Sequence, residues 1–463
     1  MVDLVTSAAP ATGGGRRVLI VTWVFPPAQV IGALRVSKFA RYLREEGWEV
    51  RVVTAAPELL PFPALLPVEF PEAETVRVRY RDPLTTLERR GRQLSAAAAA
   101  ERAAGAEPAS VRASLGTRVL RRVARGVLKV VPITQVRIPD RSTLWYRPAF
   151  RAARALCASW RPDVILSSFG PPGSHIVASW LQRETGVPWV ADYRDLWTES
   201  ISSPRPAVPS AVERSVERRV LRRAAAITTI SDPFARRLQA LHGKPVETIY
   251  NGYDEAAYAV PVEPSPEFVI TYTGLAEPSH RDPSPLFAAV RRLRDGGTDP
   301  SRLPRIRFVG SSPPGYLQGL AERHGIAGLV EVGGTVPHAE SVHLQKRSTV
   351  LLMLNWQGES PGGVLTGKLL EYVGAGRPIL AIGPHDAGVS EVLARTGAGV
   401  WRGDGAGVEA LLGEWMDLHA RTGRLELPAR TEEVARFGRR AQTHVLGELL
   451  ARVADGRGAG DGV

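Results

Sequence analysis

The stretch from Gly362 to Leu380, GGVLTGKLLEYVGAGRPIL, combines small, basic and acidic residues in the order expected where a helix begins at a phosphate group. Gly362, Gly363 and Gly367 allow a ligand to approach the backbone closely. The helix predicted from about Lys368 to Gly374 directs its free N–H groups and the positive end of its dipole towards that ligand. Lys368 opposes the dipole in the first turn, so a bound phosphate explains this lysine better than the helix alone does.

Glu371 follows three residues after Lys368, on the same face of the predicted helix. Phosphate repels a nearby carboxylate, so Glu371 is better used to accept two hydrogen bonds from the hydroxyls of a ribose. The alternative is a surface lysine and glutamate on an ordinary helix, because short motifs match by chance. The stretch therefore predicts a site for a nucleoside diphosphate and leaves that alternative open.

The elements that position these residues are alternating apolar strands and helices, which predict parallel sheets. The chain has 463 residues, which is more than a single hydrophobic core usually supports. We expect an α/β fold with two doubly wound, Rossmann-like domains facing a cleft, with ligands beyond the carboxyl ends of the strands. The predicted segments are a flexible tail at 1–16, a first domain at 17–260, a second at 261–435, and a C-terminal helix and tail at 436–463.

The charge of the chain favours an anionic partner: the net charge is +12 and the isoelectric point is near 10.2. A basic, Ala- and Arg-rich insertion is predicted at 84–131. Basic and apolar residues share its end, 115–131, at helical spacing, which fits an anionic membrane surface or, alternatively, a helix packed on the first domain. No module for binding nucleic acid is recognised, so we expect no nucleic-acid partner.

The single cysteine, Cys157, excludes an internal disulfide and fits a reducing compartment. The N-terminus lacks the pattern of a signal peptide, and no apolar run is long enough to cross a membrane. We expect a cytoplasmic protein that is either soluble or peripheral at the inner face of the membrane.

Motifs along the chain resemble those of GT-B glycosyltransferases, and more closely the family 4-like, retaining enzymes that use nucleotide sugars. The resemblance runs from Arg17 to Val453. It is carried, in the expected order, by FPPAQVIGALRVSKFARYL, WVADYRDLW, ITTISD, IYNGYD, TGLAEPSHRDP and GKLLEYVGAGRPIL. It implies a first domain that binds the acceptor and a second that binds the nucleotide sugar.

The resemblance also implies roles for individual residues. Glu371 matches the glutamate that holds the donor ribose. Arg281, seven residues beyond Gly274, stands where a lysine usually meets the diphosphate. Gly32 matches the glycine-rich loop that approaches the same diphosphate, although it could serve only a tight turn. With Gly367 and Lys368, these residues form the predicted donor site.

The chain departs from the family pattern at three positions. Gly363 replaces a glutamate often found eight residues before the ribose glutamate, and Leu275 replaces an arginine. Arg194 and Asp195 stand where a histidine frequently follows the fifth strand of the first domain. Arg194 and Asp195 are therefore the candidate catalytic contacts, together with His175 from a neighbouring loop, although a lone histidine at a helix start is more often structural.

These residues predict a glycosyltransferase that moves a sugar from a nucleotide-diphosphate sugar to a hydroxyl acceptor. The acceptor would be a lipid-linked saccharide, a polysaccharide or a small natural product. Retention of configuration follows from the resemblance alone. Because the chain contains no Asp-x-Asp pair, we expect neither a metal nor another cofactor. Two alternatives stay open: a sugar-nucleotide epimerase on the same fold, and a catalytically idle partner subunit.

Overall fold

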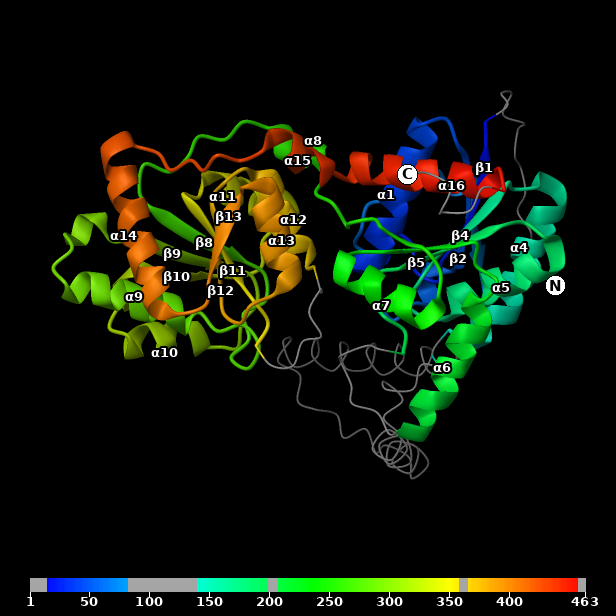
Figure 1. Ribbon diagram of the computed structural model, residues 1–463, viewed down its shortest axis with the longest axis horizontal. Coiled ribbons are helices and arrows are strands. Elements are labelled where there is room, and N and C mark those ends of the chain that lie inside the picture. Colours follow the sequence, from blue (N-terminus) through cyan, green and yellow to red (C-terminus); the bar gives the residue numbers. More distant parts are fainter. Residues whose placement is uncertain (1–14, 82–139, 141, 199–206, 358–364, 457–463) are drawn as a thin grey trace, which may run out of the picture. The chain divides into compact units, whose positions relative to one another are not determined.

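The computed structural model describes residues 15–81, 140, 142–198, 207–357 and 365–456 (Figure 1). The predicted insertion at 84–131, with its basic segment at 115–131, and nearly all of the predicted tail at 1–16 lie outside these residues. Within the described part of the chain, no helix combines the length and the apolar character that a membrane crossing requires.

The chain divides into two compact units. Unit 1 comprises the described residues up to Thr229, Leu238–Glu247, and those from Gly447 onward; unit 2 comprises Ile230–Arg237 and Thr248–Leu446. This division differs from the predicted boundaries after residues 260 and 435. Tyr253 and Tyr258 group with unit 2 because they pack into its core. The end of the chain groups with unit 1, where Arg452 pairs with Glu247 at 2.8 Å.

Unit 1 contains a seven-stranded sheet in the order β3-β2-β1-β4-β5-β6-β7, which is parallel from β3 to β6. The strands are β1 (Arg17–Val21), β2 (Glu49–Ala55), β3 (Thr75–Val78), β4 (Val164–Ser168), β5 (Trp189–Tyr193), β6 (Ala226–Thr229) and β7 (Val246–Thr248). The helices are α1 (Ile31–Glu45), α4 (Tyr146–Trp160), α5 (Gly173–Thr185) and α6 (Ala207–Leu221), with 3₁₀ turns at Pro57–Leu59, Glu72–Glu74 and Thr143–Trp145. Helix α7 (Asp232–His242) is divided, because its residues up to Arg237 belong to unit 2 and the others to unit 1.

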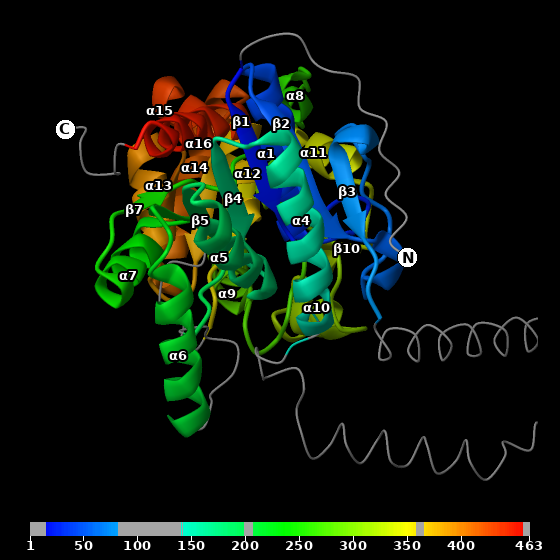
Figure 2. The ribbon, with the colours of Figure 1, turned by 90° about the vertical axis from the view of Figure 1, so that its right-hand side faces the viewer.

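Helices cover both faces of this sheet (Figure 2). Crossover connections are right-handed and the strand order reverses between β1 and β4, so α1 and α5 lie on opposite faces. With both faces covered, the central strands are continuous apolar runs, and Val18–Val21 of β1 are fully buried.

Unit 2 contains a six-stranded parallel sheet in the order β10-β9-β8-β11-β12-β13. The strands are β8 (Val269–Thr273), β9 (Arg305–Val309), β10 (Val330–Gly333), β11 (Val350–Leu354), β12 (Ile379–Ile382) and β13 (Gly399–Arg402). The helices are α8 (Glu255–Ala259), α9 (Ser284–Asp295), α10 (Tyr316–Arg323), α11 (His338–Arg347), α12 (Gly367–Ala375), α13 (Ala387–Thr396), α14 (Gly405–Thr422) and α15 (Thr431–Arg436), with 3₁₀ turns at Pro300–Arg302 and Ala327–Leu329. Helix α16 (Arg439–Ala454) is divided, because its residues up to Leu446 belong to unit 2 and the others to unit 1.

Two apolar clusters sandwich the sheet of unit 2. One cluster packs α9, α10 and α14 on the sheet through residues such as Phe287, Leu317 and Trp415. The other packs α11, α12 and α13 through residues such as Leu369 and Val389. The structure thus confirms the predicted α/β fold class with two doubly wound sheets.

A buried ion pair ties α1 to the centre of the sheet of unit 1. Arg35 donates two hydrogen bonds to Asp192, at 2.8 and 3.1 Å, and the two side chains are 1% and 0% exposed. Ser168 and Thr228 each donate a further hydrogen bond of 2.9 Å to the same carboxylate. Burial alone would raise the pKa of Asp192, but Arg35 and these hydroxyls hold it below its usual value.

We expect Asp192→Ala to lower the free energy of unfolding by about 3–5 kcal/mol, because it leaves the Arg35 charge buried without its partner. Urea denaturation measures this loss. Folding lowers the pKa of Asp192, so its carboxylate stabilises the fold at any pH above the pKa that it has in the unfolded chain. This contribution disappears as the pH falls through the pKa of the folded state. The difference between the wild type and the variant should therefore narrow in acid, below about pH 4.

Asp195→Ala is the matched control, since this aspartate lies three residues further on and its side chain is 56% exposed. The control should change the unfolding free energy by no more than about 0.5 kcal/mol. Equal stability of the wild type and Asp192→Ala would contradict a structural role for the ion pair.

Candidate functional site

The carboxyl edge of the unit 2 sheet gathers the predicted donor residues. β8 and β11 are neighbours and both end at this edge, where Gly274 follows β8. Lys368, in the first turn of α12, places its Nζ 3.6 Å from the centroid of the Tyr272 ring. Gly274 has φ +114°, and a Cβ there would lie 3.0 Å from the same Nζ. Glycine at 274 therefore provides both the backbone conformation and the space that Lys368 occupies.

Arg281 reaches the same edge from the loop after β8. Its guanidinium carbon lies 5.3 Å from the ring centroid of Trp356, which follows β11. His280 stacks on that indole with the ring centroids 4.0 Å apart and the planes 9° from parallel. The N–H of Gln357 donates to the carbonyl of His280 at 2.8 Å, so the two loops are held together.

Arg281 is close enough to Lys368 to affect the pKa of the lysine. Burial lowers the pKa of Lys368 well below its usual value, the charge of Arg281 lowers it further, and Glu371 partly opposes both. Among the described residues, neither cation forms an ion pair with a carboxylate. The structure thus brings together Arg281, Lys368 and Glu371, as the sequence predicted, and leaves their positive charge available to an anion.

The N-terminus of α12 completes this region. Among the described residues, the side chain of the N-cap residue Thr366 makes no capping hydrogen bond, and its buried hydroxyl has no partner. A Cβ on Gly367 would meet no described atom within 4 Å, so the described part of the chain does not require glycine there. Gly362 and Gly363 lie outside the described residues. The uncapped N–H groups and the open space at Gly367 suit an anion.

A buried polar network that the sequence did not reveal fixes the base of this site. Tyr258 donates to Gln345 at 2.9 Å, Gln345 contacts Thr273 at 3.4 Å, and the Thr273 N–H donates to the Tyr372 hydroxyl at 2.8 Å. Burial, and then the charge of Glu371, raises the pKa of Tyr258, which places Glu371 near this network. Only contacts between distant segments join these residues, so no local motif could have identified them.

Gly32, Arg194 and Asp195 come together at the carboxyl edge of the unit 1 sheet. Arg194 donates to the carbonyl of Phe169 at 3.1 Å, and its Nη2 lies 3.6 Å from Asp195. A Cβ on Gly32 would lie 2.7 Å from the guanidinium, and one on Gly170 would lie 2.5 Å from it. Both glycines therefore make room for Arg194. No local motif in the sequence indicated this contact.

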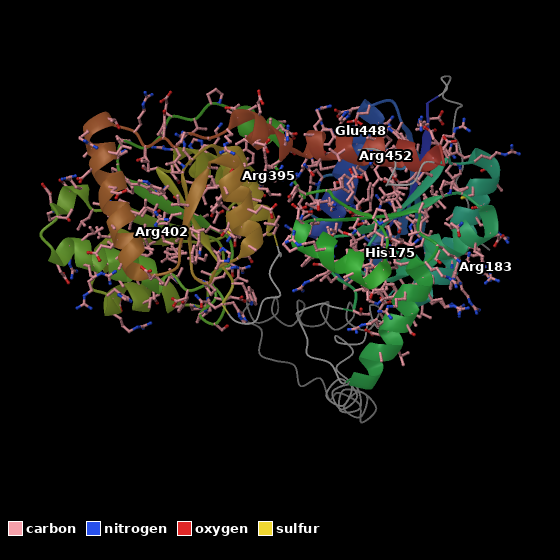
Figure 3. All side chains as sticks on the ribbon, viewed as in Figure 1. His175, Arg183, Arg395, Arg402, Glu448 and Arg452 are labelled. Atoms are coloured by element: carbon pink, nitrogen blue, oxygen red, sulfur yellow. The ribbon has the colours of Figure 1, made fainter. Side chains whose placement is uncertain are left out.

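Of the three candidate catalytic residues, His175 is the one that the structure buries. It is 0% exposed within unit 1, whereas Arg183, further along α5, is exposed (Figure 3). Its Nδ1 lies 2.7 Å from the Ser167 hydroxyl, and burial lowers its pKa to about 3, which leaves the imidazole neutral. The catalytic role of His175 stays a prediction, and its burial favours the structural reading.

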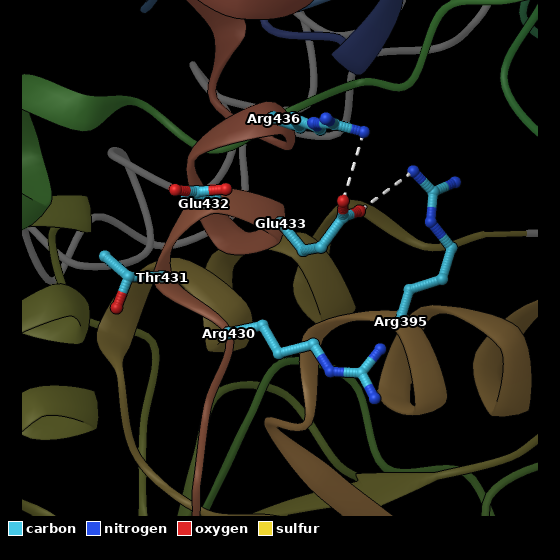
Figure 4. A pocket seen from close by; sticks show the side chains of 6 residues that line it. All are labelled: Arg395, Arg430, Thr431, Glu432, Glu433 and Arg436. Carbon is cyan, nitrogen blue, oxygen red and sulfur yellow. Dashed lines mark hydrogen bonds and ion pairs between the residues drawn. The ribbon is translucent and has the colours of Figure 1, made fainter.

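A hollow of about 690 Å³ in unit 2 lies away from these residues (Figure 4). Arg395 and Arg436 in its wall share Glu433, at 3.3 and 3.0 Å. Arg395 belongs to the last turn of α13, which leads to the amino end of β13. Ligands of doubly wound sheets bind at the carboxyl ends of the strands, so this hollow is the weaker candidate.

We expect the lowered pKa of Lys368 to appear as a pH-dependent stability difference between the wild type and Lys368→Met. The unfolded chain binds the lysine proton more tightly than the folded chain, so this residue destabilises the fold most at a pH below its folded pKa. The Met variant should therefore be the more stable protein near neutral pH. The gap should shrink as the pH rises towards about 10.4, the ordinary lysine pKa. Urea denaturation at several pH values measures this difference in unfolding free energy. A difference that does not change with pH would show that Lys368 is solvated.

Comparison with known proteins gives a domain match and several structural likenesses. Residues 91–252 match the model of the glycosyl transferase 4-like domain. No curated protein sequence matches the chain. Sucrose-phosphate synthase from Thermosynechococcus elongatus matches with a TM-score of 0.56 and 15% identity, over 95% of this chain and 100% of that chain.

Two further solved structures share the fold. HepE from Anabaena, in complex with UDP and glucose, has a TM-score of 0.56 and 14% identity, over 94% of this chain and 99% of that chain. A glycosyltransferase from Rickettsia africae has a TM-score of 0.54 and 9% identity, over 95% of this chain and 99% of that chain. At such identities these likenesses establish the fold. The chain thus carries a match to the glycosyl transferase 4-like domain and has the GT-B fold of these structures, which confirms the resemblance predicted from its sequence.

Proposed function

We propose that the protein transfers a sugar from a nucleotide-diphosphate sugar to a hydroxyl acceptor, with retention of configuration and without a metal cofactor. One observation carries the proposal: Lys368 and Arg281 lie at the carboxyl edge of unit 2 without a carboxylate partner among the described residues, with Glu371 one turn further along α12. The domain match and the UDP in the HepE structure support a nucleotide donor and make UDP-sugars the first to test.

Each residue of this edge has a proposed part in the reaction. Breaking the bond at the anomeric carbon releases negative charge onto the departing diphosphate. Lys368, Arg281 and the N–H groups at the start of α12 would stabilise that charge because they are already in place. Glu371 would accept hydrogen bonds from the ribose, which does not change during the reaction.

The unit 1 residues have proposed roles with the sugar or the acceptor. Arg194 and Asp195 offer a donor and an acceptor of hydrogen bonds at the carboxyl edge, and Gly32 makes room for Arg194. We assign them to contacts with sugar or acceptor hydroxyls. The acceptor class is a saccharide on a lipid, a polysaccharide or a small natural product, in glycoconjugate, polysaccharide or natural-product biosynthesis. The net charge of +12 supports an approach to an anionic membrane surface.

Incubation with a panel of nucleotide sugars and candidate acceptors tests the proposal. Transfer yields a glycoside and a free nucleoside diphosphate. An isomeric donor would instead reveal an epimerase, and no change in any donor would contradict an enzymatic role.

We expect Glu371→Ala and Lys368→Ala to fail in different ways. Loss of Glu371 should weaken the ground state and the transition state alike, so donor KM rises, with kcat/KM falling roughly 10- to 150-fold for a charged hydrogen bond. Loss of Lys368 should lower kcat by about 10²-fold, because the charge on the diphosphate grows as the sugar leaves.

Glu371→Gln is the control for charge, since it keeps an acceptor and should fall between the wild type and Glu371→Ala. Steady-state kinetics at varied donor concentration separate the two effects. Normal donor kinetics in both folded Ala variants would show that α12 is only structural.

We expect Gly367→Ala to keep the fold and lose the donor. The new Cβ meets open space, so stability should be unchanged or higher by up to about 1 kcal/mol, whereas donor KM should rise because the methyl group occupies ligand space. Gly374→Ala, in the same helix, is the opposite case. Its Cβ would lie 2.5 Å from the ring of Tyr253, so overpacking should cost about 1–3 kcal/mol. Thermal denaturation and donor KM should be measured on both variants. A normal donor KM in Gly367→Ala would contradict the assignment of Gly367 to the donor site.

A further inference from the structure

Both cations of the candidate donor site lie over aromatic rings. The Lys368 ammonium is 3.6 Å from the centroid of the Tyr272 ring, and the Arg281 guanidinium carbon is 5.3 Å from that of Trp356. A carboxylate would neutralise such cations and compete with a phosphate. An aromatic face attracts a cation through its quadrupole and leaves the positive charge in place.

Tyr272 is rigidly fixed beneath Lys368. The side chain is 0% exposed, and its hydroxyl donates to the carbonyl of Leu275 at 2.6 Å. Burial raises the pKa of Tyr272 to about 12, so the phenol stays neutral. The ring also packs against Phe308, with the centroids 5.7 Å apart. Tyr272 therefore cannot follow Lys368 if the lysine moves.

Trp356 is held in a different way, although it is 38% exposed. His280 stacks in parallel on the indole, and the backbone bond from Gln357 to His280 joins the loops after β8 and β11. This pairing keeps a large apolar ring at the surface beside Arg281. Core packing explains Tyr272 in part, but it does not explain an exposed indole in contact with a cation.

We propose that Tyr272 and Trp356 are positioning residues of the donor site, whose ring faces hold Lys368 and Arg281 on one side while the diphosphate of the donor binds on the other. This inference rests on the proposed function and deepens it. Because the rings leave both charges uncompensated, the site is organised for a diphosphate before the ligand arrives, which lowers the conformational cost of binding.

Trp356→Leu is the main test, because a partly exposed side chain can be replaced without disrupting the core. Calorimetry gives the wild-type affinity for UDP, GDP, ADP and TDP, and the nucleotide that binds best is the probe for the variants. We expect about 2- to 30-fold weaker binding by Trp356→Leu, the range of a cation–π contact. Trp356→Phe keeps a ring and should recover most of the loss.

Trp180→Leu is the matched control. Trp180 on α5 is also 38% exposed, but among the described residues it contacts the aromatic rings of Tyr146 and Phe150 and no cation. The control variant should bind the probe as the wild type does.

Tyr272→Leu and Tyr272→Phe add a readout that loosened packing would not give. Loss of the ring should lower the pKa of Lys368 further, so the affinity for the probe should fall off at a lower pH in Tyr272→Leu than in the wild type or Tyr272→Phe. Loosened packing would admit water and move the fall-off to higher pH. Circular dichroism confirms that each variant folds.

Unchanged binding of the probe by Trp356→Leu would overturn the inference, because the indole would then contribute nothing. Tighter binding would also overturn it, because the indole would then compete with the phosphate for Arg281. The inference would also fail if Trp180→Leu lost as much affinity as Trp356→Leu. A wild-type chain that binds none of the four nucleotides would contradict the proposed function, and this inference with it.

Discussion

Uncompensated positive charge at the carboxyl edge of the unit 2 sheet is the constraint on which the rest of the candidate site depends. Two neighbouring cations repel each other and tend to separate or to recruit a carboxylate. Here Lys368 stays near Arg281 because Gly274 removes a side chain from its path and Tyr272 supplies a ring face. Contacts elsewhere in unit 2 must therefore offset the repulsion between Lys368 and Arg281.

The buried network beneath α12 supplies part of this offset. Tyr372 points from α12 to the backbone of Thr273 at the end of β8, so helix and strand are joined by hydrogen bonds within the core. Gln345 from α11 and Tyr258 from α8 extend the connection. In unit 1 the charges are handled in the opposite way. Four hydrogen bonds satisfy Asp192, which makes this carboxylate a structural anchor rather than a reactive group.

The elements and several site residues could be predicted from the sequence because their signals are local. The helix predicted from about Lys368 to Gly374 is α12, Gly367–Ala375, and the predicted alternation of strands and helices is found in both units. Lys368 was found from its place beside glycines at a predicted helix start, whereas Arg281 was assigned through the family resemblance. The partners Tyr272 and Trp356 were not found, since a ring beneath a cation depends on the packing of separate strands. His175 shows the converse, because a sequence carries no direct sign that a histidine beside a glycine loop is fully buried.

Two glycines of unit 1 show how one side chain can determine the composition of two distant positions. Gly32 lies in the first turn of α1, and Gly170 lies in the loop after β4, yet the guanidinium of Arg194 occupies the Cβ space of both. A side chain at either position would displace the guanidinium from the carbonyl of Phe169. Gly32 was predicted to serve a diphosphate directly. In the structure, the absence of a side chain at Gly32 makes room for the guanidinium of Arg194. Any effect of Gly32 on a ligand would therefore be transmitted through the position of that arginine.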